Sequence, residues 1–379
     1  MKFTKNGLLF VLCATLFSSF ASAQTKDYYK KEMQSLHTAI QNNFYDKASG
    51  NYLVVLDPAK RETKNGYLRE YTYLWSYCAL YQAYNEMEKL DPKAKLMAPL
   101  LKLMYTYYNP APPHGGFTDY IMKLKPGERY FDDNQWIGIT SLDAYERTKD
   151  KKHFDLGKDM YDFQMTGYDQ VLGGGIYWKE GDVSTKNTCS NGPGALVALQ
   201  MYKATKQKFY LDTAIKLVKW TDSKLRTPAN LYWDNIRVKD GSIGKATFSY
   251  NTGTMLESYI YLYEFTGKKE YLDQANIIAD ASLSYFYGSG KFRDEYWFNV
   301  VLLRAYQHFL KVNKDTKYIM AFKKCLDNSL QNEKNAKGLF DTIKRNGTKE
   351  ARDLVAIGGM LEILARYAWL ETKYDLSKS

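Results

Sequence analysis

Two adjacent aspartates, Asp132 and Asp133, are the residues of this chain whose types and spacing best suit chemistry. They stand where a loop gives way to a strongly helical stretch, residues 137–148. Successive residues of a helix point roughly 100° apart, so the two carboxyl groups should lie several ångströms from each other. A retaining glycosidase needs about 5–5.5 Å between its nucleophile and its acid/base. The pair is therefore a candidate for glycoside hydrolysis.

The two carboxyl groups should also influence each other's ionisation. Both cannot ionise easily at this separation, so one apparent pKa should rise while the other stays low. Backbone amides at a helix start would stabilise the charged member. Geometry alone leaves open which aspartate is the nucleophile and which is the acid/base. A structural explanation also stays open, because aspartates commonly cap helix N-termini and interact favourably with the helix dipole.

The first 23 residues predict a secretory signal peptide. Lys2 and Lys5 supply a positive start, residues 8–17 an apolar core, and Ala21-Ser22-Ala23 a small-residue cleavage site. The apolar run is too short to span a bilayer, and no later segment reaches the roughly 20 residues required. We therefore expect an exported monomer, periplasmic or secreted, with no membrane span. Residues 24–379 should form a single domain.

Charge and cysteine usage exclude several classes of function. The chain has 53 basic and 42 acidic residues, a net charge of +11, but its lysines are spread along the sequence. Nucleic-acid binding would need a focused basic patch and a recognisable module, and the sequence has neither. Attraction to a phosphorylated or acidic glycan stays open. The cysteines and histidines of the mature chain are widely scattered, which predicts no disulfide framework, no metal site and no cofactor. They are Cys78, Cys189, Cys325, His37, His114, His153 and His308.

A repeat of about sixty residues indicates how the chain is organised. Three segments share the pattern Tyr-x-x-Thr, then a short lysine-rich turn, then an aromatic residue. Their threonines, Thr148, Thr205 and Thr266, are 57 and 61 residues apart. A fixed period of this size is typical of stacked helix pairs. The mature length accommodates six such pairs.

Apolar positions at helical spacing predict twelve helices and an all-α fold. Six helical hairpins can stack as an open solenoid or close into a double ring, the (α/α)6 barrel or toroid, and we expect the closed form. Closure would bury the inner ring and leave a funnel lined by the inner helices' N-terminal ends. The predicted helices span residues 27–43, 69–87, 95–108, 133–148, 152–165, 191–205, 209–225, 250–266, 270–286, 294–311, 315–330 and 353–370.

The long loops fall on one side of each pair, before the helices expected to start at residues 69, 133, 191, 250 and 294. Long loops on a rigid scaffold commonly carry function. Tyrosine and tryptophan offer sugars a flat apolar face and a polar tip, and asparagines at helix starts could contact a hydroxyl. The alternatives are loop packing for the aromatics and capping for the asparagines. The candidate substrate-binding residues are Trp136, Tyr177, Trp178, Asn191, Trp233, Asp234, Tyr250 and Asn251.

Four motifs, in this order, resemble glycoside hydrolase family 76, the endo-acting α-1,6-mannanases. They are Phe131-Asp132-Asp133-Asn134-Gln135-Trp136, Gly173-Gly174-Gly175-Ile176-Tyr177-Trp178, Lys186-Asn187-Thr188-Cys189-Ser190-Asn191-Gly192-Pro193 and Tyr250-Asn251-Thr252-Gly253. The similarity runs through roughly residues 30–370. The resemblance implies an (α/α)6 barrel, a mannan substrate and a retaining mechanism, with Asp132 as nucleophile and Asp133 as acid/base. One departure lies at residues 292–298, where the family usually has a Phe-Lys-Gly sequence.

Two other functions stay open. A non-catalytic mannan-binding protein could use the same scaffold, although binding alone has no need of two adjacent acids. A sugar epimerase or lyase-type enzyme would rely on histidines facing the cavity, and only His114 lies in a funnel-side loop. An inverting reaction would place the second carboxylate elsewhere, with Asp234 or Asp182 as the replacement.

Overall fold

Helices of two kinds alternate along the chain. The computed structural model describes residues 27–64, 67–125, 127–344 and 346–376, so the predicted signal peptide lies outside the described residues. The even-numbered helices are buried along nearly their whole length, whereas the odd-numbered ones bury one face. The helices of the described chain are α1 (Tyr28–Asn43), α2 (Leu74–Leu90), α3 (Met97–Met104), α4 (Phe131–Thr148), α5 (Lys151–Met165), α6 (Thr188–Thr205), α7 (Lys208–Leu225), α8 (Ser249–Thr266), α9 (Lys269–Ser282), α10 (Tyr296–Asn313), α11 (Lys317–Asn332) and α12 (Leu354–Leu370).

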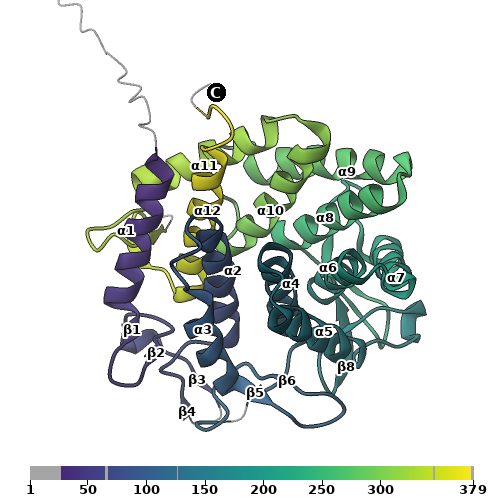
Figure 1. Cartoon of the computed structure of the whole chain (residues 1–379), viewed down its shortest axis with the longest axis horizontal. Coiled ribbons are helices and arrows are strands. Elements are labelled where there is room, and N and C mark those ends of the chain that lie inside the picture. Colours follow the sequence, from purple (N-terminus) through teal and green to yellow (C-terminus); the bar gives the residue numbers. More distant parts are fainter. Residues whose placement is uncertain (1–26, 65–66, 126, 345, 377–379) are drawn as a thin grey trace, which may run out of the picture.

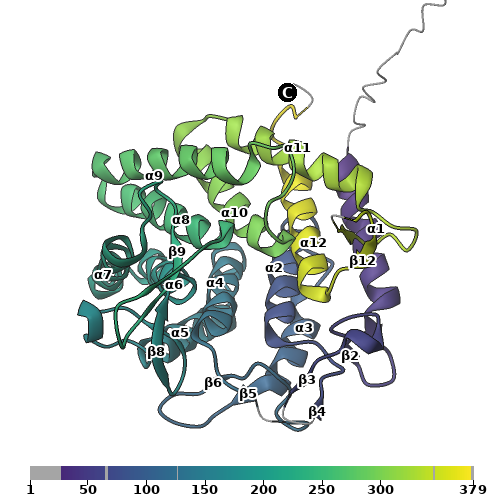
Figure 2. The same cartoon turned by 180° about the vertical axis from the view of Figure 1, so that it is seen from behind.

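The even-numbered helices form a closed inner ring (Figures 1 and 2). Each packs against the next, from α2 through α4, α6, α8 and α10 to α12, and α12 packs against α2. A helix that is apolar all round requires burial on every side, and this closure provides it. The fold is therefore the predicted helical toroid rather than an open solenoid.

The sixth helix pair is assembled from the two ends of the described chain. Five pairs are consecutive hairpins, but α12 packs against α1. The backbone amides of Tyr29 and Lys30 donate to the Glu371 carboxylate at 3.3 and 3.2 Å. The rings of Tyr29 and Tyr367 lie 5.2 Å apart. No helix of the described residues is long and apolar enough to cross a membrane.

The sixty-residue repeat marks the turns between inner and outer helices. Lys149, Lys206 and Gly267 each adopt a left-handed conformation just after an inner helix, with φ of 60°, 61° and 67°. Each amide donates to the tyrosine carbonyl of the Tyr-x-x-Thr pattern at 2.8 Å. The threonine hydroxyl accepts the amide two residues further on. The pattern is thus a helix stop signal repeated in these three hairpins.

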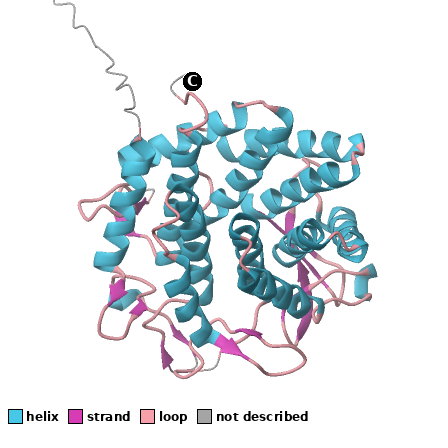
Figure 3. Cartoon of the chain, in the orientation of Figure 1, coloured by secondary structure: helices cyan, strands magenta, loops and turns pink. Residues whose placement is uncertain are grey.

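The loops contain short strands that the sequence did not predict (Figure 3). The largest sheet is antiparallel, with strand order β10-β9-β8-β7. The others are two-stranded hairpins. The strands are β1 (Tyr45–Asp46), β2 (Asn51–Tyr52), β3 (Thr63–Lys64), β4 (Tyr67–Leu68), β5 (Tyr108–Asn109), β6 (Gly116–Phe117), β7 (Tyr177–Lys179), β8 (Asp182–Asn187), β9 (Trp233–Arg237), β10 (Ile243–Thr247), β11 (Asp341–Ile343) and β12 (Lys349–Ala351).

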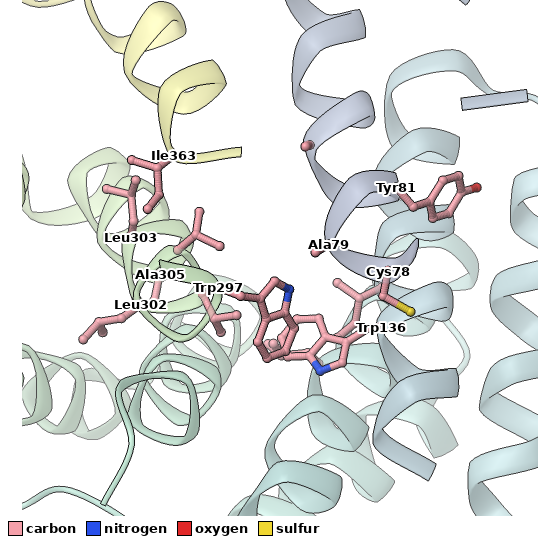
Figure 4. Packing of buried hydrophobic residues seen from close by; sticks show 14 of the residues in the cluster. Cys78, Ala79, Tyr81, Trp136, Trp297, Leu302, Leu303, Ala305 and Ile363 are labelled. Atoms are coloured by element: carbon pink, nitrogen blue, oxygen red, sulfur yellow. The ribbon is translucent and has the colours of Figure 1, made fainter. Parts of the chain in front are cut away.

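Inside the ring, aromatic side chains close the barrel below the strand-bearing end. The rings of Trp136 and Trp297 meet edge to face with centroids 5.1 Å apart (Figure 4). Trp297 Nε1 donates to Gln82 at 2.9 Å, which satisfies its buried N–H group. Trp75 packs edge to face on Trp297 at 5.2 Å. These residues form the floor on which the candidate site stands.

Candidate active site

A cavity of about 550 Å³ opens at the N-terminal end of the inner ring. Its walls come from the first turns of α2, α4, α6, α8 and α10 and from β8, β9 and their neighbouring loops. This is the funnel predicted from the loop pattern. The lining residues are Glu62, Arg69, Tyr73, Trp75, Asp119, Tyr130, Asp132, Asp133, Trp136, Trp178, Thr185, Asn187, Cys189, Asp234, Asn235, Phe248, Tyr250, Trp297 and Phe298.

The start of α4 brings both aspartates into this cavity. Asn134, on the buried side of the same turn, accepts a hydrogen bond from the Phe117 amide at 2.7 Å. Its amide nitrogen donates to the carbonyls of Phe117 and Tyr130 at 2.9 and 2.8 Å. This clamp ties the first turn of α4 to strand β6, and Asp132 and Asp133 project from that turn.

Asp132 has hydrogen-bond donors around its carboxylate. Trp178 Nε1 donates to Oδ2 at 3.1 Å, and the Asp133 amide donates to Oδ1 at 3.0 Å. Burial raises the pKa of Asp132 to about 6. Hydrogen bonds, the first of them from the Cys189 thiol, oppose that rise because they favour the charged form.

Asp133 has the less favourable environment for a negative charge. Burial raises its pKa well above the usual range, and the charges of Asp132 and Asp119 raise it further. Donated hydrogen bonds are not among the causes of the shift. Of the two carboxyl groups, Asp133 is therefore the one that keeps a proton to higher pH, while Asp132 ionises first.

The cavity is strongly acidic. Asp119, Asp234 and Glu62 join the central pair on its wall, and Arg69 is the one basic side chain among the described lining residues. Arg69 Nη1 donates to Asp119 Oδ2 at 2.9 Å, and both side chains are nearly buried. The sequence did not single out either residue, because they lie in two loops 50 positions apart with no diagnostic spacing.

Aromatic residues also line the wall, among them Trp136, Trp178 and Tyr250, which were predicted from the sequence to lie at the funnel. Trp178 is 40% exposed, and its ring lies tilted by 57° against the Tyr130 ring with centroids 4.9 Å apart, so it is available beside Asp132. Tyr250 packs on Phe298 at 4.4 Å. Trp136 is only 2% exposed, so it forms part of the cavity floor rather than an open platform.

Tyr177 and Trp233 do not reach the cavity. Tyr177 donates its hydroxyl to Asp169 at 2.7 Å, and the Lys186 ammonium lies 4.6 Å from its ring. Successive strand residues point to opposite faces, so Trp178 faces the cavity while Tyr177 faces away. In the same way Trp233 packs against Ile236 and its neighbours in a small separate cluster, whereas Asp234 lines the cavity. In this structure both side chains have packing contacts outside the cavity, and their sugar contacts stay a prediction.

The two predicted asparagines are also buried away from the cavity. Asn191 accepts from the Ile176 amide at 2.7 Å and donates to the Ile176 and Asn187 carbonyls at 3.0 and 2.7 Å. This repeats, one hairpin later, the clamp that Asn134 makes with Phe117. Asn251 is fully buried in α8. Asn191 therefore acts as a structural clamp in this structure, and its contact with a sugar hydroxyl stays a prediction.

The glycine triplet before Trp178 allows the loop to pass close to neighbouring side chains. Gly173, Gly174 and Gly175 all have positive φ, and a Cβ on Gly175 would lie 2.7 Å from the Trp220 ring. Lys186 Nζ, fully buried, donates to the carbonyls of Gly174 and Gly175 at 2.7 and 3.0 Å. The loop is thus held by a buried ammonium group, which positions Trp178.

His114, Asp159 and Asp162 form the one grouping of described residues with the spacing of a metal site. Their ligand atoms lie within 4.8 Å of one another, and Asp162 is also paired with Lys158 at 2.5 Å. None of the three lines the candidate cavity.

Comparison with known proteins agrees with this geometry. The family model described as Glycosyl hydrolase family 76 matches residues 23–375. The chain belongs to glycosyl hydrolase family 76. Among solved structures, an α-mannanase of this family from Bacteroides thetaiotaomicron aligns with a TM-score of 0.80 at 24% identity, covering 91% of this chain and 96% of that one.

Two further relatives are informative. An inactive variant of an α-1,6-mannanase from Salegentibacter, in complex with α-1,6-mannotriose, aligns with a TM-score of 0.71 at 22% identity over 90% of this chain and 99% of that one. Mannan endo-1,6-alpha-mannosidase DFG5 of Candida albicans is 29% identical over 178 residues, 42% of this chain. That match spans 39% of the yeast protein, so the chain covers about two fifths of the curated relative's length.

Proposed function

We propose that this protein is an exported, endo-acting α-1,6-mannanase that cleaves mannan with retention of configuration. Residues 24–379 would form its single catalytic domain after removal of the signal peptide. The observation that carries the proposal is the pair Asp132 and Asp133, which faces the cavity with unequal proton affinities. Membership of the family and the mannosidase names of its relatives supply the substrate class.

In the first step Asp132 is the nucleophile. Its carboxylate attacks the anomeric carbon while Asp133 donates its proton to the leaving glycosidic oxygen, and a glycosyl ester forms on Asp132. The Trp178 indole and the Asp133 amide hold the Asp132 carboxylate in position. The higher pKa of Asp133 suits it to be protonated when the substrate arrives.

In the second step the roles of Asp133 reverse. The Asp133 carboxylate takes a proton from a water molecule as that water attacks the anomeric carbon. The ester bond to Asp132 breaks, and the original charge state of both residues is restored. Aromatic rings around the pair, Trp178 and Tyr250 among them, provide apolar faces for sugar C–H groups.

Linear α-1,6-mannooligosaccharides test the proposal directly. Incubation with the protein should release shorter oligosaccharides from internal bonds, detected by chromatography. Binding of the same oligosaccharides without turnover would mean a mannan-binding protein instead. Epimerised sugars without bond cleavage would establish the third alternative.

A further inference from the structure

A second groove adjoins the candidate active site at the same end of the barrel. It has a volume of about 770 Å³ and lies between the start of α10, the end of α11 and the hairpin β11–β12. Phe248 and Phe298 line both this groove and the catalytic cavity. A glycan that leaves the cavity past these two rings therefore enters the groove.

The two spaces have opposite electrostatic character. The catalytic cavity has five carboxyl groups and one arginine on its described walls. The groove has four basic side chains, Lys291, Arg293, Lys344 and Arg352, against three acidic ones. An anionic substituent is therefore repelled near the cleaved bond and tolerated further along the chain.

The acidic side chains of the groove are already engaged. Arg352 pairs with Glu295 at 2.5 Å and with Glu333 at 2.7 Å. Asp294 accepts a hydrogen bond from the Ser249 amide at 2.6 Å. The carboxylates of the groove are thus bound to cationic or amide groups of the protein itself.

Two cations remain available to a ligand. No carboxylate of the described residues lies at ion-pair distance from Lys291 or Arg293, and both side chains are exposed. The Arg293 guanidinium lies 3.9 Å from the centroid of the Tyr285 ring. Such stacking orients the guanidinium plane and leaves its N–H groups free to bind an anion.

We propose that this groove is a distal subsite for an acidic group, a phosphate ester or a carboxylate, on the glycan that Asp132 and Asp133 cleave. The inference rests on the proposed function, because it assigns a substrate class to the same enzyme. Lys291 and Arg293 are the residues that contact the anion. A neutral mannose unit occupies the acidic cavity while the charged unit lies beyond Phe248 and Phe298.

The test compares three kinds of α-1,6-linked tetrasaccharide: the neutral mannotetraose, a form phosphorylated on a terminal mannose, and a form with a terminal uronic acid. Each acidic form is made with the charge at either end of the chain. We expect one acidic isomer to exceed the neutral tetraose about tenfold in kcat/KM at low salt, with the preference shrinking in ~0.5 M salt. A preference for phosphate alone identifies a phosphate subsite, and a preference for both acids identifies a general anion subsite.

A double variant, Lys291→Ala with Arg293→Ala, should abolish the preference and leave turnover of the neutral tetraose unchanged. The matched control, Lys268→Ala with Lys269→Ala, removes the same charge from an exposed turn of the α8–α9 hairpin and should keep the preference. Equal turnover of all three substrates by the parent enzyme, or an undiminished preference in the double variant, would overturn the inference.

A binding measurement separates failure of this inference from failure of the proposed function. The Asp132→Asn variant is titrated calorimetrically with the neutral and acidic tetraoses. Tighter binding of an acidic isomer, lost in the triple variant that also lacks Lys291 and Arg293, supports the subsite even if no substrate is cleaved. Equal affinities reject it independently of activity.

Discussion

Both ends of the inner helical ring bury carboxyl groups, but the pKa values of Asp132 and Asp133 at one end and of Glu86 and Glu257 at the other shift in opposite directions. At the N-terminal end, Asp132 and Asp133 face a cavity with little compensating charge, and their pKa values are raised. At the C-terminal end, burial also acts on Glu86 and Glu257, but the guanidinium groups of nearby arginines outweigh it. The pKa of each glutamate falls to about 2.

The difference lies in the partners that the fold supplies. Arg304 Nε donates to Glu257 at 2.7 Å, and Arg366 Nη2 lies 3.3 Å from Glu86. No comparable cation reaches Asp132 or Asp133 from the described walls of the cavity. Burial alone therefore does not mark a functional carboxylate. Burial without a counter-charge is the feature that favours a functional role for Asp132 and Asp133.

Asp132 at one end, and Glu86 and Glu257 at the other, should also respond to pH in opposite directions. The pKa of Asp132 is about 6 in the folded chain, against roughly 3.9 when unfolded. Its contribution to stability is present below about pH 4 and is lost as pH rises through 6. Glu86 and Glu257 contribute stability above about pH 4.3 that is lost as pH falls towards 2.

Replacing either aspartate of the proposed catalytic pair should have the largest effect on activity. Asp132→Asn and Asp133→Asn should each lower kcat on α-1,6-mannan by at least about 10³-fold. Each should leave the helical circular dichroism and the melting temperature unchanged or raised, because like-charge repulsion is relieved. Asp182→Asn, on the exposed end of β8 outside the cavity, is the control and should keep full activity. Near-parental turnover in either test variant would remove that residue from the mechanism.

Removing an arginine that pairs with the buried carboxylates at the C-terminal end of the ring should affect stability instead of activity. Arg304→Met leaves Glu257 and Asp143 without their shared partner, and it should lower the free energy of unfolding by about 3–5 kcal/mol. Activity per folded molecule should change little. Urea denaturation measures the loss, with Arg237→Met on the exposed end of β9 as control. A stability equal to that of the control would contradict the comparison between the two ends.

An activated aryl α-mannooligosaccharide should separate the roles of the two aspartates. A good leaving group needs little protonation, so the alanine variant of Asp133 should recover about 10²-fold in the first step relative to mannan. The alanine variant of Asp132 should recover nothing, because it lacks the nucleophile. Rescue at Asp132 rather than Asp133 would reverse the assignment.

The smallest expected effect concerns the pH profile. Activity should fall as pH drops through about 6, where Asp132 becomes protonated. Asp119→Asn removes one of the charges that raise the pKa of Asp133, so the alkaline limb of kcat/KM should move to lower pH by up to about one unit. A loss of activity that is equal at every pH, with no shift of the alkaline limb of kcat/KM, would assign Asp119 a structural role only.

The helices could be predicted from the sequence because each carries its own signals. Apolar spacing and the Tyr-x-x-Thr stop place most boundaries within three residues of those observed. The second predicted helix is the main exception, since it was expected from Arg69 but α2 begins at Leu74. Arg69 instead lies in the loop before it, paired with Asp119.

The site was only partly predictable, because its residues converge from separate loops. Asp132 and Asp133 could be proposed from the sequence because they are adjacent and begin a helix, and both line the cavity. Arg69 and Asp119 meet only through tertiary folding, which no local spacing reveals. The strands around the cavity are short and polar, so they lack the long apolar alternation that identifies a strand. The sequence likewise did not show which face of β7 each side chain occupies. That difference places Trp178 in the cavity and Tyr177 outside it.

Early-time proton NMR of the products tests the central claim most directly. If Asp132 and Asp133 act together on one glycosidic bond from the same helical turn, the reaction proceeds through a glycosyl ester on Asp132. The first oligosaccharide released from α-1,6-mannan should then carry the α-anomeric signal, with the β-anomer appearing only by later mutarotation. A β-anomer appearing first would show a direct displacement by water. The second carboxylate would then lie elsewhere, with Asp234 on the cavity wall as the leading candidate.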